Sequence, residues 1–121
     1  MSFLPTVVPI NLFRNADFEL AVRWVDTDGT PFPLSDLKMQ VREADDPESD
    51  LFLEASVANG RSDLGEEPDY WSSILIPAEA IAAVDWPQRL PFYDIVAVRS
   101  SDGRRRRVRQ GRVLVSPGVT A

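Results

Sequence analysis

Hydrophobic and polar side chains alternate with a period of two along most of this chain, which is the pattern of strands with one buried face. The clearest examples are DFELAVRWV (17–25), with apolar Phe18, Leu20, Val22 and Trp24, and LKMQVREA (37–44), with apolar Leu37, Met39 and Val41. The stretch TVVPINLF (6–13) predicts an edge strand, because Pro9 has no amide hydrogen for a central ladder. Further strand-like segments are 51–58, 70–77, 92–100 and 104–115.

Turn signals separate these segments at regular spacing. Asn59–Gly60 and Ser101–Gly103 each stand between two strand patterns, so both predict β-hairpins. The polar stretches 45–50 and 61–69 predict loops, and Pro77–Ala83 is the one segment with a helical pattern. Six or seven short strands with one short helix predict an all-β fold, an antiparallel β-sandwich of immunoglobulin-like type formed by the whole chain as a single domain. A small β-barrel is the alternative.

Composition narrows the chemistry that this domain can perform. The chain has no cysteine, which excludes disulfides and thiolate metal sites, and no histidine, which removes the commonest general base. It contains no glycine-rich phosphate loop, nucleophile elbow or zinc-ligand spacing. We therefore expect a protein that is not an enzyme and that binds no cofactor and no metal. The N-terminus does not predict a signal peptide, and no apolar run is long enough to cross a membrane.

Charge is divided unevenly along the chain, whose formal net charge is -6. Residues 1–98 contain 6 basic and 18 acidic side chains, whereas residues 99–121 contain 7 basic and 1 acidic. This division predicts an electrostatic contact, either within one copy or between copies. We expect the basic half of the contact to be Arg104, Arg105, Arg106, Arg107 and Arg109. We expect the acidic half to be the 45–50 loop, or Glu66, Glu67 and Asp69.

Simple alternation puts arginines on both faces at the start of the last strand. Arg105, Arg107 and Arg109 then share one face, and Arg106 shares the other face with Val108. A strand that is charged on both faces cannot lie over an apolar core. We therefore expect this end of the hairpin to project past the sandwich or to be covered by acidic side chains.

Three interpretations of these arginines remain open. The first is a solvated hairpin whose charges keep an edge strand from pairing with other chains. The second is contact with an acidic surface, on another copy of this chain or on another protein. The third is contact with nucleic-acid phosphates, which the acidic composition and the lack of aromatic residues in 99–121 disfavour. We expect protein partners, no nucleic acid and no membrane.

Two further patterns give less specific signals. Asp26 and Asp28 resemble the start of a calcium-binding loop, but the later ligands of such a loop are missing and we expect a turn. Trp71 and Trp86 are candidate platforms for a sugar ring, so a carbohydrate-binding β-sandwich module is the alternative function. The position of Trp24 on a core-facing period predicts a core residue.

Both ends of the chain, residues 10–44 and 93–121, also contain an ordered set of motifs. In the segment 10–44, a strand ends in an Asp-x-x-Gly turn and the next strand contains Gln-Val-Arg. The residues that match this motif are Asp26, Gly29, Pro31 or Pro33, Leu34 or Leu37, Gln40, Val41 and Arg42. In the segment 93–121, the matching residues are Tyr93, Asp94, Gly111, Val113, Val115, Pro117, Val119 and Thr120. Together these ends resemble a group of small tailed-phage virion proteins, in particular the immunoglobulin-like N-terminal domain of siphophage upper baseplate proteins.

This resemblance implies a role in assembly. Proteins of the group use the domain to assemble into the virion, and fibre or receptor-binding parts follow it. This chain ends at PGVTA (117–121), where those proteins continue, which implies assembly or decoration rather than host binding. We therefore expect a non-enzymatic virion structural protein, either a tail or baseplate component or a capsid decoration protein, made in the bacterial host cytoplasm. Its expected partners are other copies of itself, in a homo-oligomer on the particle, and other virion proteins.

Overall fold

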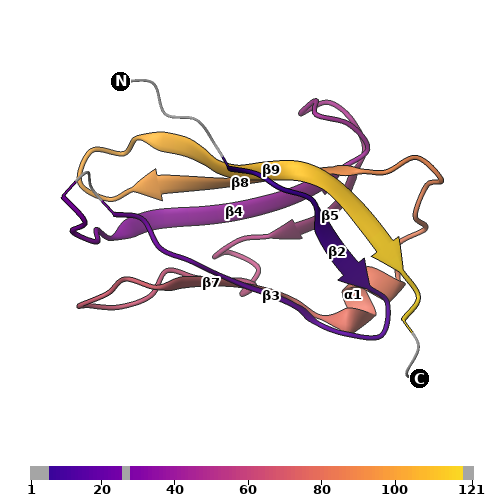
Figure 1. The fold of residues 1–121 in the computed structure, drawn as a ribbon, viewed down its shortest axis with the longest axis horizontal. Helices are drawn as coiled ribbons and strands as arrows, with labels where there is room; N and C mark the ends of the chain where they lie inside the picture. The colour runs from indigo at the N-terminus through magenta and orange to yellow at the C-terminus, as the bar shows by residue number, and fades with distance from the viewer. Residues whose placement is uncertain (1–5, 26–27, 119–121) are drawn as a thin grey trace.

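The chain folds into two β-sheets that pack face to face, with one short helix at the end of the sandwich where β2 and β9 finish (Figure 1). The structure is a computed structural model and describes residues 6–25 and 28–118. The elements are β1 (Thr6–Val7), β2 (Ile10–Phe13), β3 (Phe18–Val22), β4 (Leu34–Arg42), β5 (Leu51–Ala55), β6 (Ser62–Asp63), β7 (Ser72–Ile76), α1 (Ala78–Ala82), β8 (Phe92–Arg99) and β9 (Arg105–Ser116).

The strand order identifies the fold. The larger sheet has the order β1-β9-β8-β4-β5, with β2 also paired to β9, and the smaller sheet has the order β3-β7-β6. The strands β1 and β2 run parallel to β9, whereas the other pairs are antiparallel. This is the arrangement of an immunoglobulin-like sandwich, in which the three-stranded β9-β8-β4 sheet is extended by one further strand at its β4 edge. The predicted fold class is therefore confirmed.

Alternating side chains of both sheets meet in one core. The buried residues of β4 (Leu34, Leu37, Met39 and Val41) belong to the same hydrophobic cluster as Ile74 and Ile76 of β7. Because successive side chains of a strand point to opposite faces, the period-two pattern of the sequence appears directly as this buried layer. The helix α1 adds Ile81 to the cluster, and the partly buried ring of Trp24 packs against it, as predicted.

The edge strand predicted at the N-terminus is present, and Pro9 interrupts it between β1 and β2. The hydroxyl of Tyr93 donates a hydrogen bond of 2.7 Å to the carbonyl oxygen of Val8 at this interruption. Gly111 of β9 lies opposite Tyr93, and a Cβ at Gly111 would be 2.3 Å from the carbonyl oxygen of Val8. Glycine is therefore required here by the close approach of the two backbones.

Three details differ from the sequence-based expectations. The strand expected at 17–25 ends at Val22, because Val25 instead bridges to Pro31. The loop expected at 61–69 contains β6. The turn at Asn59–Gly60 does not close a hairpin, because it joins β5 of the larger sheet to β6 of the smaller sheet.

The side chain of Asn59 explains this change of sheet. Its amide nitrogen donates a hydrogen bond of 2.9 Å to the carbonyl oxygen of Glu54, and its oxygen accepts one of 3.0 Å from the backbone N–H of Ser56. These bonds use backbone groups that a hairpin partner would need. The second predicted hairpin is confirmed: β8 and β9 pair antiparallel, and Gly103 in the turn has a φ of 69°.

Candidate functional site

A β-bulge in β9 decides where the arginines point. Ile95 of β8 is opposite Arg109, whereas the next residue, Val96, is opposite Arg107, so Val108 is an extra residue without a partner. The bulge reverses the alternation, and the expectation that Arg107 and Arg109 share a face is therefore wrong. Arg109 lies on the inner side with buried Ile95, and Arg107 lies on the outer side.

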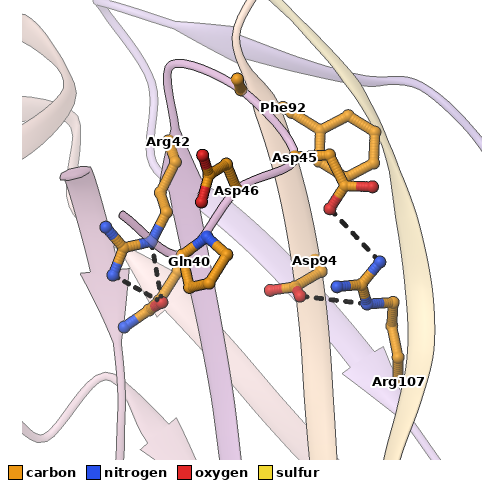
Figure 2. Close-up of a pocket in the computed structure, with 9 residues that line it drawn as sticks. Gln40, Arg42, Asp45, Asp46, Phe92, Asp94 and Arg107 are labelled. Carbon is orange, nitrogen blue, oxygen red and sulfur yellow. Dashed lines mark hydrogen bonds and ion pairs between the residues drawn. The ribbon is translucent and has the colours of Figure 1, made fainter. Parts of the chain in front are cut away.

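On the outer side, Arg107 is the centre of an ion-pair network (Figure 2). Its Nε lies 3.2 Å from Asp94 Oδ2, and its Nη1 lies 3.3 Å from Asp45 Oδ1. The same Nη1 donates a hydrogen bond of 2.8 Å to Gln110 Oε1. Asp45 belongs to the acidic 45–50 loop, so one contact of the kind predicted between arginines and this loop is made within a single copy.

The other side of the loop is held by Arg42. Its Nη1 donates a hydrogen bond of 2.7 Å to the carbonyl oxygen of Ser49, while its Nε and Nη2 donate to Gln40 Oε1 at 3.2 Å and 3.1 Å. The amide nitrogen of Gln40 in turn donates a hydrogen bond of 2.8 Å to Glu54 Oε1. Two arginines from different strands thus fasten the acidic loop onto the outer face of the larger sheet.

A small pocket remains between this loop and the sheet, with Asp94 in its wall (Figure 2). Burial raises the pKa of Asp94, while the charge of Arg107 acts in the opposite direction. The pocket has a volume of about 110 Å³. Pockets that bind small molecules have volumes of about 300 to 1,000 Å³. The geometry therefore supports a structural role for the Arg107 network rather than a substrate site.

The other predicted arginines occupy different surroundings. Arg104 is highly exposed and lies 3.5 Å from Asp102 in the hairpin turn. Arg105 is exposed on the outer side, opposite Val98. Arg106 is on the inner side, opposite buried Ala97. The Nε of Arg109 is buried without a hydrogen-bond partner. The structure therefore distributes the five predicted arginines over both sides of the sheet.

Arg105 lies on the outer side at the start of β9, and a group of residues that was not predicted from the sequence lies on the same side toward the end of β9. Arg112 is opposite Phe92, and its guanidinium lies 5.7 Å from the centre of that ring and donates a hydrogen bond of 3.3 Å to the carbonyl oxygen of Leu90. Leu90 is 45% exposed, and Leu114 is 43% exposed. We call Arg105, Arg112, Leu90 and Leu114 the outer β9 surface. The sequence signal for this group is the two-residue spacing of Arg112 and Leu114, which puts both side chains on the same face of a strand.

The predicted acidic partners Glu66, Glu67 and Asp69 lie in the connection between β6 and β7 of the smaller sheet. Asp69 Oδ1 is 3.8 Å from the guanidinium of Arg23. Glu67 accepts a hydrogen bond of 3.0 Å from the hydroxyl of Tyr70, and this bond raises the pKa of that hydroxyl. The contacts of Glu67 and Asp69 are therefore made on the smaller sheet, away from β9.

The two candidate sugar platforms differ in exposure. Trp86 packs edge-on against Phe52, with ring centres 5.6 Å apart, and its indole N–H donates a hydrogen bond of 2.9 Å to the carbonyl oxygen of Ile81. Trp86 is therefore a partly buried residue that packs against the edge of the hydrophobic core. Trp71 is 53% exposed, and the guanidinium of Arg23 lies 4.8 Å from its ring centre. Of the two, Trp71 is the ring that remains accessible.

The parts of the chain that the structure describes contain no group of three or more side chains arranged to hold a metal ion. Asp28 accepts a hydrogen bond of 3.0 Å from the backbone N–H of Thr30, which lowers the pKa of its carboxyl and fits the predicted turn. Asp26, the other residue of the candidate calcium loop, lies outside the described residues. Within residues 6–25 and 28–118, no helix has the length and apolar character needed to span a membrane.

Comparison with known proteins adds distant likenesses in solved structures, among them the following three. No family model and no curated protein matches this chain. A solved structure concerned with multimeric cell-adhesive interactions of VGSC beta subunits has 11% identity, covers 95% of this chain and 96% of its own, and gives a TM-score of 0.45. The structure of the NK cell receptor NKp44 has 12% identity, covers 94% of this chain and 100% of its own, and gives a TM-score of 0.44. The extracellular domain of the voltage-gated sodium channel beta4 subunit, described as a parallel homodimer, has 9% identity, covers 98% of this chain and 98% of its own, and gives a TM-score of 0.40. The assignment of the fold rests on the strand order described above.

Proposed function

We propose that this chain is a non-enzymatic assembly protein of a tailed-phage virion and that it acts by binding other proteins. The observation that supports a binding role best is the composition of the outer β9 surface. Arg112 lies there beside two leucines that are each more than two-fifths exposed, and Arg105 lies on the same side at the start of the strand. Arginine and large apolar side chains are enriched where proteins bind one another. The motifs at both ends of the chain, which resemble virion proteins, support the phage assignment.

The charges of this surface favour an acidic partner. The ion pairs of Arg107 are satisfied within the chain, whereas Arg105 projects outward from the start of the strand. Exposed cations steer a complementary surface into contact and set its orientation. Many copies on a symmetric particle would make even a weak contact effective through multivalency.

The virion assignment is tested by looking for the chain in particles. Particles produced from the genome that encodes the chain are purified, and their proteins are quantified by mass spectrometry. We expect the chain at a fixed number of copies per particle. A genome that yields no particles, or particles without the chain, would overturn the assignment. Binding to purified capsids that lack tails would identify a decoration protein, whereas binding to isolated tails would identify a tail or baseplate component.

The role of the outer β9 surface is tested by charge reversal in the same particles. Arg105→Glu should lower the number of copies per particle, because it places a carboxylate where an acidic partner would bind. The matched control is Arg14→Glu, which reverses an exposed charge on the connection between β2 and β3. Equal incorporation of the two variants would show that the outer β9 surface is not the contact.

One observation favours a second candidate function, carbohydrate binding. Exposed Trp71 precedes by two residues Ser73, which is in the wall of a shallow hollow of about 550 Å³ on the smaller sheet. The hollow is lined by Glu19, Leu20, Ala21, Ser73, Ile74 and Leu75. An exposed aromatic ring next to polar groups suits the apolar face of a sugar. Binding on a glycan array that is lost in Trp71→Ala and retained in Leu51→Ala, at an exposed leucine of the larger sheet, would support this function. No binding on the array by the unaltered chain would exclude it for the glycans tested.

A further inference from the structure

The smaller sheet has an open edge at β3. This strand pairs with β7 from Phe18, opposite Ile76, to Val22, opposite Ser72. On its other side, no strand among the described residues pairs with it. The cause is the path of the N-terminal strands, because β1 and β2 pair with β9 of the larger sheet instead of β3 (Figure 1). An open edge presents unpaired backbone N–H and C=O groups, which can pair with another strand.

The edge at β3 lacks the protection that the edge at β5 has. At β5, the carbonyl oxygen of Glu54 accepts hydrogen bonds from Asn59 Nδ2 at 2.9 Å and from Arg61 Nη1 at 3.1 Å. The five residues of β3, FELAV, include no proline, glycine or lysine. Their core-facing side chains Phe18, Leu20 and Val22 are only half-buried. A strand added beside β3 would therefore bury further apolar surface as well as satisfying backbone groups.

The outward-facing side chains of this strand and the residue after it are Glu19, Ala21 and Arg23, and their charges are self-complementary. If two copies pair antiparallel about a two-fold axis at Ala21, Glu19 of each copy lies opposite Arg23 of the other. Directly opposite side chains in an antiparallel pair have Cβ atoms about 4.5 to 5.5 Å apart, close enough for charges to interact. The small side chain of Ala21 faces its own copy at the axis, and Leu20 lies opposite Val22 on the core side.

Registers with the axis at Glu19, Leu20 or Arg23 are less favourable. An axis at Glu19 or at Arg23 would place like charges directly opposite each other, which destabilises a pair of strands. An axis at Leu20 would place Arg23 opposite Asp17, whose carboxylate already accepts a hydrogen bond of 2.8 Å from the backbone N–H of Ala78. The contact of Arg23 with Asp69 does not compete strongly, because it is long at 3.8 Å and the Asp69 side chain is 62% exposed.

We propose that two copies of this chain associate through their β3 edges, antiparallel and with the two-fold axis at Ala21. The two smaller sheets then become one continuous sheet of six strands. This inference rests on the proposed assembly role and names one of its partners, a second copy. It uses the smaller sheet, whereas the outer β9 surface belongs to the larger sheet and remains free for another protein. The two proposals can therefore fail separately.

The test is the dissociation constant of the dimer, measured by sedimentation equilibrium over a wide concentration range. Glu19→Arg and Arg23→Glu should each weaken the dimer by about tenfold or more, since each variant places like charges together twice across the axis. The double variant with both substitutions should restore the affinity. Glu48→Arg, at an exposed position of the acidic loop, is the matched control and should leave the dimer unchanged. Circular dichroism establishes that each variant is folded.

Ala21→Lys gives an independent test of the axis. It places two ammonium groups against each other at the two-fold axis, on an exposed position that the fold does not need, and it should abolish the dimer. The proposal is overturned if the unaltered chain is monomeric up to about 1 mM, a concentration at which weak contacts are already populated. It is also overturned if a dimer survives Ala21→Lys, or if the double charge exchange fails to restore it. Incorporation of Arg105→Glu into particles reports separately on the outer β9 surface.

Discussion

Replacement of Arg107 by methionine tests the network that fastens the acidic loop, because it keeps an unbranched side chain and removes the charge. The guanidinium lies 3.2 Å from Asp94 and 3.3 Å from Asp45, and it donates a hydrogen bond of 2.8 Å to Gln110. Ion pairs at the surface contribute up to about 1 kcal/mol each, and hydrogen bonds about 1 kcal/mol. Because the Arg107 side chain is 41% exposed, solvent screens both pairs. We expect Arg107→Met to lower the free energy of unfolding by about 1 to 2 kcal/mol at pH 7.

The size of this loss should depend on pH through Asp94. Burial raises the pKa of Asp94 above 3.8 in the folded chain, against the effect of Arg107. The folded chain therefore binds this proton more tightly than the unfolded chain does. The contribution of the carboxyl group to stability is fully present below the unfolded pKa and is lost as the pH rises through the folded pKa. Arg107 limits that loss only while Asp94 is charged, so the cost of Arg107→Met should fall to about half or less at pH 3.

Urea unfolding followed by tryptophan fluorescence at both pH values measures these differences. Arg105→Met is the matched control, since Arg105 is exposed on the same side of the same strand. This control should lie within about 0.5 kcal/mol of the unaltered chain. Equal costs for the two variants at pH 7 would refute the reasoning about the network. A cost of Arg107→Met that is the same at pH 3 would refute the part assigned to Asp94.

Further substitutions and a salt titration test other parts of the account. Gly111→Ala should lower the free energy of unfolding by more than about 2 kcal/mol in thermal unfolding, because the added Cβ would meet the carbonyl oxygen of Val8. Gly103→Ala should lower it by only about 1 kcal/mol, because the added Cβ lies in open space and only the φ of 69° is unfavourable. A larger loss for Gly103→Ala than for Gly111→Ala would contradict this argument. Tyr93→Phe removes the donor of the 2.7 Å hydrogen bond to Val8 and should cost about 1 kcal/mol in urea unfolding, whereas no change would mean that the bond contributes nothing. The chain bound to particles through arginines should be released at about 1 M salt, where the Debye length is about 3 Å, and retention in a sedimentation assay would contradict charge-driven binding.

Much of the fold could be predicted from alternation because one face of each long strand is buried. Leu37, Met39 and Val41 are apolar in the sequence and fully buried in the structure. The turn at Asn59 could not be predicted in the same way. Asparagine followed by glycine is typical of hairpins, but here its side chain bonds to Glu54 and Ser56 and directs the chain into the other sheet. Which sheet receives the next strand depends on contacts that lie far apart in the sequence.

The candidate site could be predicted from the sequence only in part, because a β-bulge at Val108 changes which side of the sheet the arginines face. The cluster of arginines and the acidic loop are both visible in the sequence, and Arg107 joins the two through Asp45. The side on which each arginine lies depends on the bulge at Val108, which inserts one residue and reverses the alternation after it. A bulge of this kind adjusts the twist between paired strands and has no simple composition signal. Exposed Leu90 was missed because it lies just outside the strand pattern.

The parallel pairing of the first strands with the last strand has a mechanical consequence. Thr6 of β1 is opposite Arg109, and after the interruption at Pro9 the pairing resumes in β2 and ends where Phe13 is opposite Ser116 at the end of β9. A force that pulls the start of β1 away from the end of β9 acts along these strands and in opposite directions on the two partners. The hydrogen bonds between them are then loaded together, in shear, instead of opening one after another. In a particle whose parts are under tension, this domain would transmit load between its two ends without unfolding first at either one.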